Sequence, residues 1–260
     1  MIRGFFRKIF RIIRLLLWLP DVGLRTVFAL RGKTPDERIQ TASRYTIQWA
    51  AGIRDILNMH VHIHGNLPES KGVLLVSNHL GYLDIVVHAS FMGVRFAPKK
   101  EIRTWPVLGP YLGLSQPVWI DRKNRAKSQE TLLEFENTLE LEVPLIVYPE
   151  GTSTDGLHGL LPFKSTPFEA AIKNNRPIQP MITMYKVPEG SMNPAWFGDQ
   201  ELLPHVWELL GIREIHADIH LLPPVYPNQY ANRKELAEAV REKMLAVYQK
   251  VMEERKEDAK

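Results

Sequence analysis

The chain has 260 residues, of which 45% are hydrophobic and 24% are charged, as in a folded protein long enough for one large domain. It contains no cysteine, which excludes disulfides and thiolate metal sites and fits a reducing compartment. The net charge is +4, but five positive residues precede the first acid, Asp21, and the remainder carries −1. This distribution argues against a nucleic-acid partner and favours a local anionic one.

The first 19 residues have the pattern of a basic amphipathic helix that ends at Pro20. No uncharged run approaches the ~20 residues that span a bilayer, and Arg14 interrupts the only stretch resembling the core of a signal peptide. We therefore expect this helix to lie at a membrane interface, with its arginines on anionic headgroups. The expected contact residues are Phe5, Phe6, Phe10, Trp18, Arg7 and Arg11. A helix packed on its own domain is the alternative. The missing signal peptide leads us to expect the cytoplasmic face of a bacterial inner membrane.

Strand and helix patterns alternate over most of the remaining chain, after a helical stripe at 36–58. Strands are expected at 60–64, 72–76, 95–101, 117–122, 143–148, 177–184 and 215–222, and helices at 85–91, 124–142, 168–174 and 233–255. The segments 105–115 and 190–214 read as largely irregular. This order predicts an α/β fold, with a mixed, mostly parallel sheet flanked by helices and an N-terminal membrane-associated helical segment. We divide the chain into 1–58, an α/β domain at 59–228, and a C-terminal helix at 229–260.

Three histidines, His60, His62 and His64, alternate along the first expected strand and share one face. Neighbouring histidines on a strand are able to share zinc, which would suit a metal-dependent hydrolase. A half-exposed edge strand is the simpler interpretation. No carboxylate or further histidine nearby completes a ligand set at a recognisable spacing, so we expect no metal site.

The apolar strand at 72–76 leads into Asn78 and His79, and Asp84 follows five residues after the histidine. On a continuous helix these two side chains would point about 140° apart. They meet only if the backbone bends between them, and Gly81 suits such a bend. Asp84 would then accept a hydrogen bond from one ring nitrogen of His79 and leave the other ready to take a proton. A histidine–aspartate pair is usually structural, so the rest of the chain has to decide between a structural and a catalytic role.

Polar residues follow the ends of three expected strands, in blocks that read NHLGYLD at 78–84, VWIDR at 118–122 and YPEGTST at 148–154. Open α/β sheets bind ligands at such ends. In this order, and followed by an apolar strand containing Pro180, the blocks resemble the glycerolipid acyltransferase family that includes the 1-acylglycerol-3-phosphate acyltransferases. The resemblance covers roughly residues 60–225. It implies transfer of a fatty acyl group from acyl-CoA or acyl carrier protein to the free hydroxyl of a lysolipid, without a cofactor.

The resemblance also assigns roles to individual residues. His79 would be the general base, oriented by Asp84, and would later protonate the leaving thiolate. Backbone amides around Gly151 and Thr152 would contact the oxyanion or the acceptor. The other expected substrate contacts are Asn78, Lys100, Arg122, Glu150, Ser153 and Lys164. Arg122 and Lys100 would bind an anionic group, and Glu150 would orient Arg122 or the acceptor hydroxyls. No acyl-enzyme is required, since the chain has no cysteine and no serine in a nucleophile-elbow pattern.

One position departs from the family pattern. Ser153 stands where the family usually has an arginine that is thought to hold the phosphate of the acceptor. The stretch around it resembles the variant of lyso-ornithine lipid acyltransferases, whose acceptor has no phosphate. Lys164 would supply the missing charge if the acceptor does carry a phosphate. Both acceptors remain open, as does a peripheral lipid-binding protein without catalysis, which would leave the polar residues at the strand ends unexplained.

Overall fold

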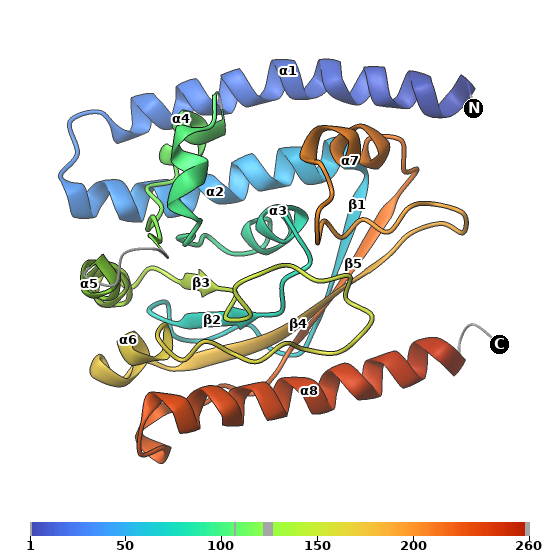
Figure 1. Cartoon of the computed structure of the whole chain (residues 1–260). Coiled ribbons are helices and arrows are strands. Elements are labelled where there is room, and N and C mark those ends of the chain that lie inside the picture. The colour runs from blue at the N-terminus through green and yellow to red at the C-terminus, as the bar shows by residue number, and fades with distance from the viewer. Residues whose placement is uncertain (1, 107, 122–126, 258–260) are drawn as a thin grey trace.

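Figure 1 shows a computed structural model that describes residues 2–106, 108–121 and 127–257, built around one five-stranded sheet. The strands are β1 (Met59–His64), β2 (Leu74–Ser77), β3 (Leu145–Val147), β4 (Ile178–Lys186) and β5 (Ile215–Leu221). They lie in the order β1-β5-β4-β2-β3, and only the β4–β5 pair is antiparallel. The predicted mixed, mostly parallel sheet is confirmed. The expected strands at 95–101 and 117–122 form only isolated bridges, Arg95 with Leu145 and Lys99 with Ile120.

Helices cover both faces of the sheet. The α-helices are α1 (Ile2–Leu30), α2 (Pro35–Leu57), α3 (Leu83–Ala89), α4 (Leu108–Gly113), α5 (Lys127–Glu140), α6 (Phe168–Lys173), α7 (Leu202–Leu209) and α8 (Arg233–Glu257). Two short 3-10 helices, η1 (Lys100–Thr104) and η2 (Pro227–Gln229), complete the elements. In Figure 1 the long helices α1 and α2, together with α3 and α7, lie above the sheet, and α8 lies below it.

The period-two alternation of the strands divides the core into two layers. On the α3 face, Leu75 and Met181 pack with Leu83 and Val87 of α3. On the α8 face the packed residues include Leu74, Val76, Ile178 and Ile182 of the sheet with Leu236, Val240 and Met244 of α8. The C-terminal helix therefore shares a core with the sheet, and the division of the chain into three parts stays a prediction.

The first helix continues through Pro20, where the sequence predicted its end. A proline inside a helix removes one backbone hydrogen bond and crowds the preceding turn. Packing against α2 on both sides of Pro20 offsets this cost. Val22 and Leu30 are buried, and Trp18 packs so closely on Gly52 that even a Cβ there would collide with the indole. Trp18 therefore faces the protein rather than a membrane.

The expected headgroup contacts of Arg7 and Arg11 are also wrong, because both side chains point into the protein. Arg7 donates to the Gly211 carbonyl at 2.6 Å. Arg11 is only 3% exposed and binds four backbone carbonyls at 2.5–3.2 Å, those of Leu57, Leu210, Ile212 and Arg213. These carbonyls lie at and just beyond the C-terminal ends of α2 and α7, where helices leave acceptors unpaired and carry partial negative charge. Burial, with Arg7 and Arg14 nearby, lowers the pKa of Arg11 to about 10, so it stays charged at neutral pH.

The helix α7 lies in the segment 190–214 that the sequence analysis described as irregular. Its third residue is Pro204, which weakened the helical pattern. Proline is tolerated in a first turn because the amide it removes has no partner within the helix.

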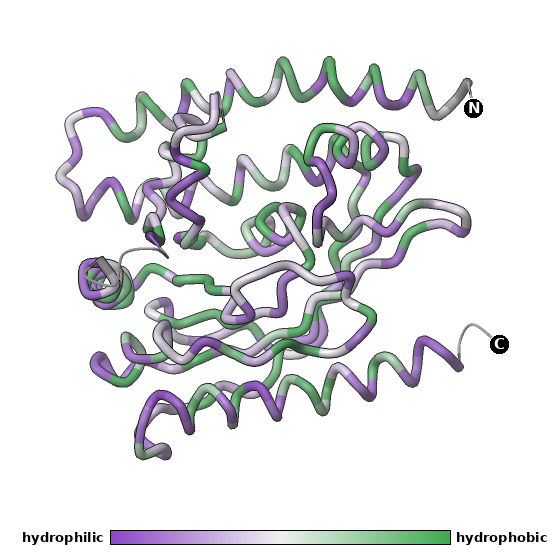
Figure 2. The backbone as a smooth tube through the Cα atoms, viewed as in Figure 1, coloured by the Kyte–Doolittle hydropathy of each residue, from purple (hydrophilic) through white to green (hydrophobic). Residues whose placement is uncertain are grey.

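Arg7 and Arg11 occupy the inner side of α1, and many of its apolar residues face outward. In Figure 2 hydrophobic and hydrophilic residues alternate along α1, at the edge of the molecule farthest from α8. The exposed side chains include Phe6, Phe10, Ile13, Leu16, Leu17, Leu24 and Phe28. Among the described residues, none of the helices combines the length and apolarity that crossing a bilayer requires.

We predict that Arg11→Met lowers the free energy of unfolding by roughly 3 kcal/mol, because buried carbonyls lose a charged donor. Arg14→Met is the matched control, since Arg14 is exposed on the same helix and its change should cost well under 1 kcal/mol. Urea unfolding followed by circular dichroism measures both values. Equal stabilities of the two variants would contradict the anchoring role of Arg11.

Candidate active site

The backbone bends at Gly81 and brings His79 to Asp84. Gly81 has a φ of +140°, in the region that favours glycine, and a Cβ there would lie 2.9 Å from the Trp196 nitrogen. The turn precedes α3, whose second residue is Asp84. The Nδ1 atom of His79 lies 2.7 Å from Oδ2 of Asp84. The expected meeting of the two side chains is thus present, and the assignment of Nδ1 as the donor leaves Nε2 as an acceptor.

The carboxylate of Asp84 is fully buried and surrounded by donors. Besides His79, the amides of Leu80 and Gly81 donate to Oδ2 at 2.7 and 3.1 Å, and the Tyr185 hydroxyl donates to Oδ1 at 2.6 Å. Burial by itself would raise the pKa of Asp84. The hydrogen bond and charge of His79, the nearby His88 and the Tyr185 hydroxyl outweigh burial and hold that pKa below its usual value. Asp84 is therefore an anion that fixes the orientation of the imidazole.

The ring of His79 stacks on Tyr148, with centroids 4.2 Å apart and planes inclined by 19°. The Tyr148 hydroxyl is bonded to Nδ1 of His88 at 3.0 Å, and Nε2 of His88 lies 2.8 Å from the Thr183 hydroxyl. Burial lowers the pKa of His88 to about 4, although Asp84 acts in the opposite sense, so His88 is neutral at physiological pH. The imidazole of His79 is thereby held at its edge by Asp84 and on its face by Tyr148. About a quarter of the His79 side chain remains exposed.

The third motif is bonded directly to the first. Glu150 accepts from the His79 amide at 3.0 Å through Oε1 and from the Leu161 amide at 2.8 Å through Oε2. The Thr154 amide donates to the His79 carbonyl at 2.9 Å. Burial raises the pKa of Glu150 against the opposing effect of these hydrogen bonds. Its described contacts place Glu150 as a residue that joins two loops. The expected contact with Arg122 lies outside the described residues, and the contact with the acceptor stays a prediction.

The turn at Gly151 brings Lys164 to the same loop. Gly151 has a φ of +75°, and a Cβ there would collide with Nζ of Lys164. The ammonium group of Lys164 therefore lies against the turn that carries Thr152 and Ser153. The Gly151 amide donates to the Tyr148 carbonyl at 3.1 Å, so it closes the turn instead of facing a substrate. The Thr152 amide stays a candidate oxyanion donor, and the Thr152 side chain is exposed.

The other expected substrate contacts have different positions. Asn78 is buried and bonds the backbone of Thr183 twice, as donor at 3.0 Å and as acceptor at 2.8 Å, so its contacts favour a positioning role. Lys100 forms an ion pair of 3.2 Å with Asp121 at the expected second strand end. Arg122 lies outside the described residues.

Sequence reasoning missed three residues of this site, which are Tyr148, Tyr185 and His88. Tyr148 directly precedes Pro149 and Glu150 in the third motif, so its position was a signal that went unused. Tyr185 reaches Asp84 from β4, 101 residues away, and no local pattern marks that contact.

An apolar pocket lies between α1, α2 and the α4 segment. Its lining residues are Thr26, Ala42, Tyr45, Thr46, Trp49, Phe96, Tyr111, Leu112, Leu114 and Ser115, around a cavity of about 40 Å³. Tyr111, Leu112 and Leu114 come from the stretch 105–115 that the sequence analysis described as largely irregular.

We predict that His88 makes stability depend on pH between about 6.5 and 4. The unfolded chain takes up a proton at His88 near pH 6.5, whereas the folded chain does so only near pH 4. Stability is therefore lost as the pH falls through this window. Between pH 7.5 and 5 the loss from His88 should be about 2 kcal/mol. Urea unfolding of the wild type and His88→Gln at both pH values isolates this contribution, and an equal pH dependence in the two proteins would contradict it.

Comparison with known proteins identifies the chain's relatives. The family profile described as Acyltransferase matches residues 58–184. A protein named lyso-ornithine lipid O-acyltransferase from Brucella abortus is 31% identical over 211 residues, which cover 76% of this chain and 79% of that protein. One of the same name from Rhodobacter capsulatus is 34% identical and covers 71% and 68%. A 1-acyl-sn-glycerol-3-phosphate acyltransferase from Neisseria meningitidis is 26% identical and covers 94% of each chain.

The fold also matches a solved structure, the 1-acyl-sn-glycerophosphate (LPA) acyltransferase PlsC from Thermotoga maritima. The TM-score is 0.71 with 20% identity, and the match covers 96% of both chains. At this identity the likeness concerns the fold alone. The sequence relatives carry the classification: with 31% identity over 79% of a curated acyltransferase, the chain belongs to the acyltransferase family and is an acyltransferase.

Proposed function

We propose that the enzyme transfers a fatty acyl group from an acyl thioester to the free hydroxyl of a lysolipid at a membrane surface, with His79 as the general base. The observation that carries this proposal is the 2.7 Å contact between Nδ1 of His79 and the buried, ionised carboxylate of Asp84. The names of the relatives, which are lysolipid acyltransferases, supply the substrate class.

The geometry suits a direct transfer. Nε2 of His79 takes the proton of the acceptor hydroxyl while the hydroxyl oxygen attacks the thioester carbonyl. The tetrahedral intermediate places negative charge on the former carbonyl oxygen, for which the Thr152 amide is the candidate donor. Collapse of the intermediate breaks the carbon–sulfur bond, and the protonated imidazole returns its proton to the thiolate. Asp84 stabilises the imidazolium between these two steps.

The acyl donor and the membrane have candidate sites as well. The apolar pocket beside Tyr111 and Leu114 has a lining that suits a hydrocarbon chain. The outward face of α1 adds a larger apolar surface, to which α7 contributes Leu203, 79% exposed, and Trp207, whose ring packs edge-on to Phe5. A monomeric soluble protein rarely exposes so much contiguous apolar surface, and we propose that this face lies on the bilayer.

Two acceptors are supported by different observations. The relatives that are 31% and 34% identical are lyso-ornithine lipid acyltransferases, and Ser153 fits their variant of the third motif. Lys164, which lies against Gly151 in the same loop, offers a positive charge that suits a phosphate-bearing lysolipid.

We predict that His79→Ala lowers turnover by at least about 10³-fold because the general base is lost. The measurement is acyl transfer by detergent-purified protein with one long-chain acyl thioester, and with lysophosphatidate or lyso-ornithine lipid as the acceptor. His64→Ala is the control, since His64 is exposed on β1, and it should leave the rate unchanged. Full activity of a folded His79→Ala protein would refute the mechanism.

The same assay separates the acceptors. Turnover of lysophosphatidate that falls at least about ten-fold in Lys164→Met identifies Lys164 as a phosphate contact. Turnover of lyso-ornithine lipid alone identifies Ser153 as part of a pocket for an acceptor without phosphate.

We predict that Phe10→Glu combined with Leu17→Glu weakens binding to lipid vesicles by at least about ten-fold. The reason is that two apolar side chains are then missing from the surface that is transferred from water into the bilayer. Leu67→Glu combined with Leu133→Glu is the matched control, since both leucines are exposed elsewhere. Cosedimentation with vesicles that contain anionic lipid measures the difference. Equal binding of the two double variants would exclude the outer face of α1 as the docking surface.

A further inference from the structure

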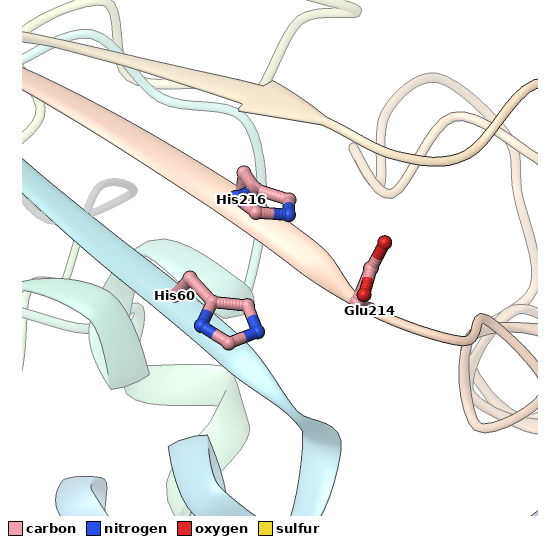
Figure 3. A group of neighbouring side chains, drawn as sticks. All are labelled: His60, Glu214 and His216. Carbon is pink, nitrogen blue, oxygen red and sulfur yellow. The ribbon is translucent and has the colours of Figure 1, made fainter.

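The first residues of β1 and β5 bring two histidines and a carboxylate together. His60 and His216 are direct partners in the parallel register of the two strands. Their rings stack with centroids 4.9 Å apart, and Glu214 directly precedes β5. One ligand atom from each of the three residues lies within 4.8 Å of the others. Figure 3 shows the three side chains gathered over the beginnings of the two strands, with one ring nitrogen of His216 toward Glu214.

The three ligand atoms, and the hydrogen bond that orients one of them, match those of transition-metal sites. Two imidazole nitrogens and one carboxylate oxygen are ligands of zinc, with the fourth tetrahedral position left for water. Tetrahedral zinc holds its ligands about 3.4 Å apart, a separation that small side-chain rotations reach from 4.8 Å. Nδ1 of His216 lies 3.2 Å from Nε2 of His62, and this contact orients the ring and leaves Nε2 of His216 to face Glu214. A hydrogen bond from the second ring nitrogen commonly orients a metal-binding histidine.

We propose that His60, Glu214 and His216 bind one divalent transition-metal ion of the zinc type, at a site separate from the acyltransferase centre. His216 shares the face of the sheet on which Asp218 binds Arg255 of α8 at 2.6 Å. Tyr185, which holds Asp84, lies on the opposite face together with Ala217. The metal site and the catalytic pair are therefore on different faces.

The position of the site suggests what a bound ion does. Glu214 follows Arg213, and the carbonyls of Ile212 and Arg213 are two of those that hold Arg11 of α1. An ion that joins β1 to the residue before β5 therefore stabilises the segment whose carbonyls bind Arg11. Because it binds the folded chain, it raises the midpoint of thermal unfolding.

The test is uptake of Zn²⁺ by tag-free, chelator-treated protein, measured by isothermal titration and by elemental analysis after dialysis, with Co²⁺ as the spectroscopic probe. We expect one ion per chain and a higher thermal midpoint with Zn²⁺. His60→Ala, His216→Ala and Glu214→Gln should each weaken binding by roughly ten-fold or more, while their metal-free stability and acyl transfer stay near wild type.

Two histidine controls make the test specific. His64→Ala removes a histidine from the same strand, stacked on His220, and His158→Ala removes an exposed histidine paired with Asp155. Both should bind Zn²⁺ as the wild type does. No stoichiometric uptake, or an equal loss of binding in the control variants, would overturn the proposal.

Discussion

The buried carboxylate of Asp84 is the group on which the arrangement of the candidate active site depends. An ionised carboxylate without water is stable only when its oxygens receive hydrogen bonds. Here the donors come from three places: the turn at Gly81, the ring of His79 and the Tyr185 hydroxyl on β4. The bend before α3, the position of α3 on the sheet and the orientation of the imidazole are thus consequences of one charge. A rearrangement that removes any of these donors would leave part of that charge unpaired.

A second buried charge sets the position of α1. Arg11 is bound by backbone carbonyls, with no carboxylate among its described partners. Carbonyls at helix ends are unpaired acceptors, and a guanidinium with five donors satisfies several of them together. Because Arg7 and Arg11 are one helical turn apart, both must face inward, and the aromatic and aliphatic residues between them must face outward. The exposed apolar surface of α1 therefore follows from the inward pairing of Arg7 and Arg11.

Sequence patterns predicted the five strands of the sheet and the meeting of His79 with Asp84, because each depends on residues close together in the chain. The alternation of strand and helix patterns predicted the mixed sheet, but two further expected strands, 95–101 and 117–122, form only isolated bridges. They could not tell which side of an amphipathic helix faces the protein, since the pattern of α1 suits a membrane interface and a packed helix alike. The sequence also could not predict contacts between residues that are far apart in the chain. Tyr185 reaches Asp84 from β4, and Glu214 and His216 join His60 only because β5 pairs with β1. A carboxylate and a second histidine therefore lie beside His60 in the fold, although the sequence offers none at a recognisable ligand spacing.

The strand registers place the catalytic pair, the proposed metal site and the carbonyls that bind Arg11 at the same end of the strands, called here the catalytic edge of the sheet. β2 and β4 are parallel and end at this edge, where His79 and Tyr185 lie, and the antiparallel β5 begins there, since His216 pairs with Lys186. β1 begins at the same edge because it is parallel to β5. Arg11 binds the carbonyls that immediately precede these two strands, so α1 is fixed at the edge from which His79 projects. For an acceptor whose hydrocarbon chains stay in the bilayer, the reacting hydroxyl remains near the interface. In the proposed docking on a bilayer, α1 is anchored at the catalytic edge and holds the base at that depth. Anchoring at the opposite end of the strands would place the length of the strands between the membrane and the base.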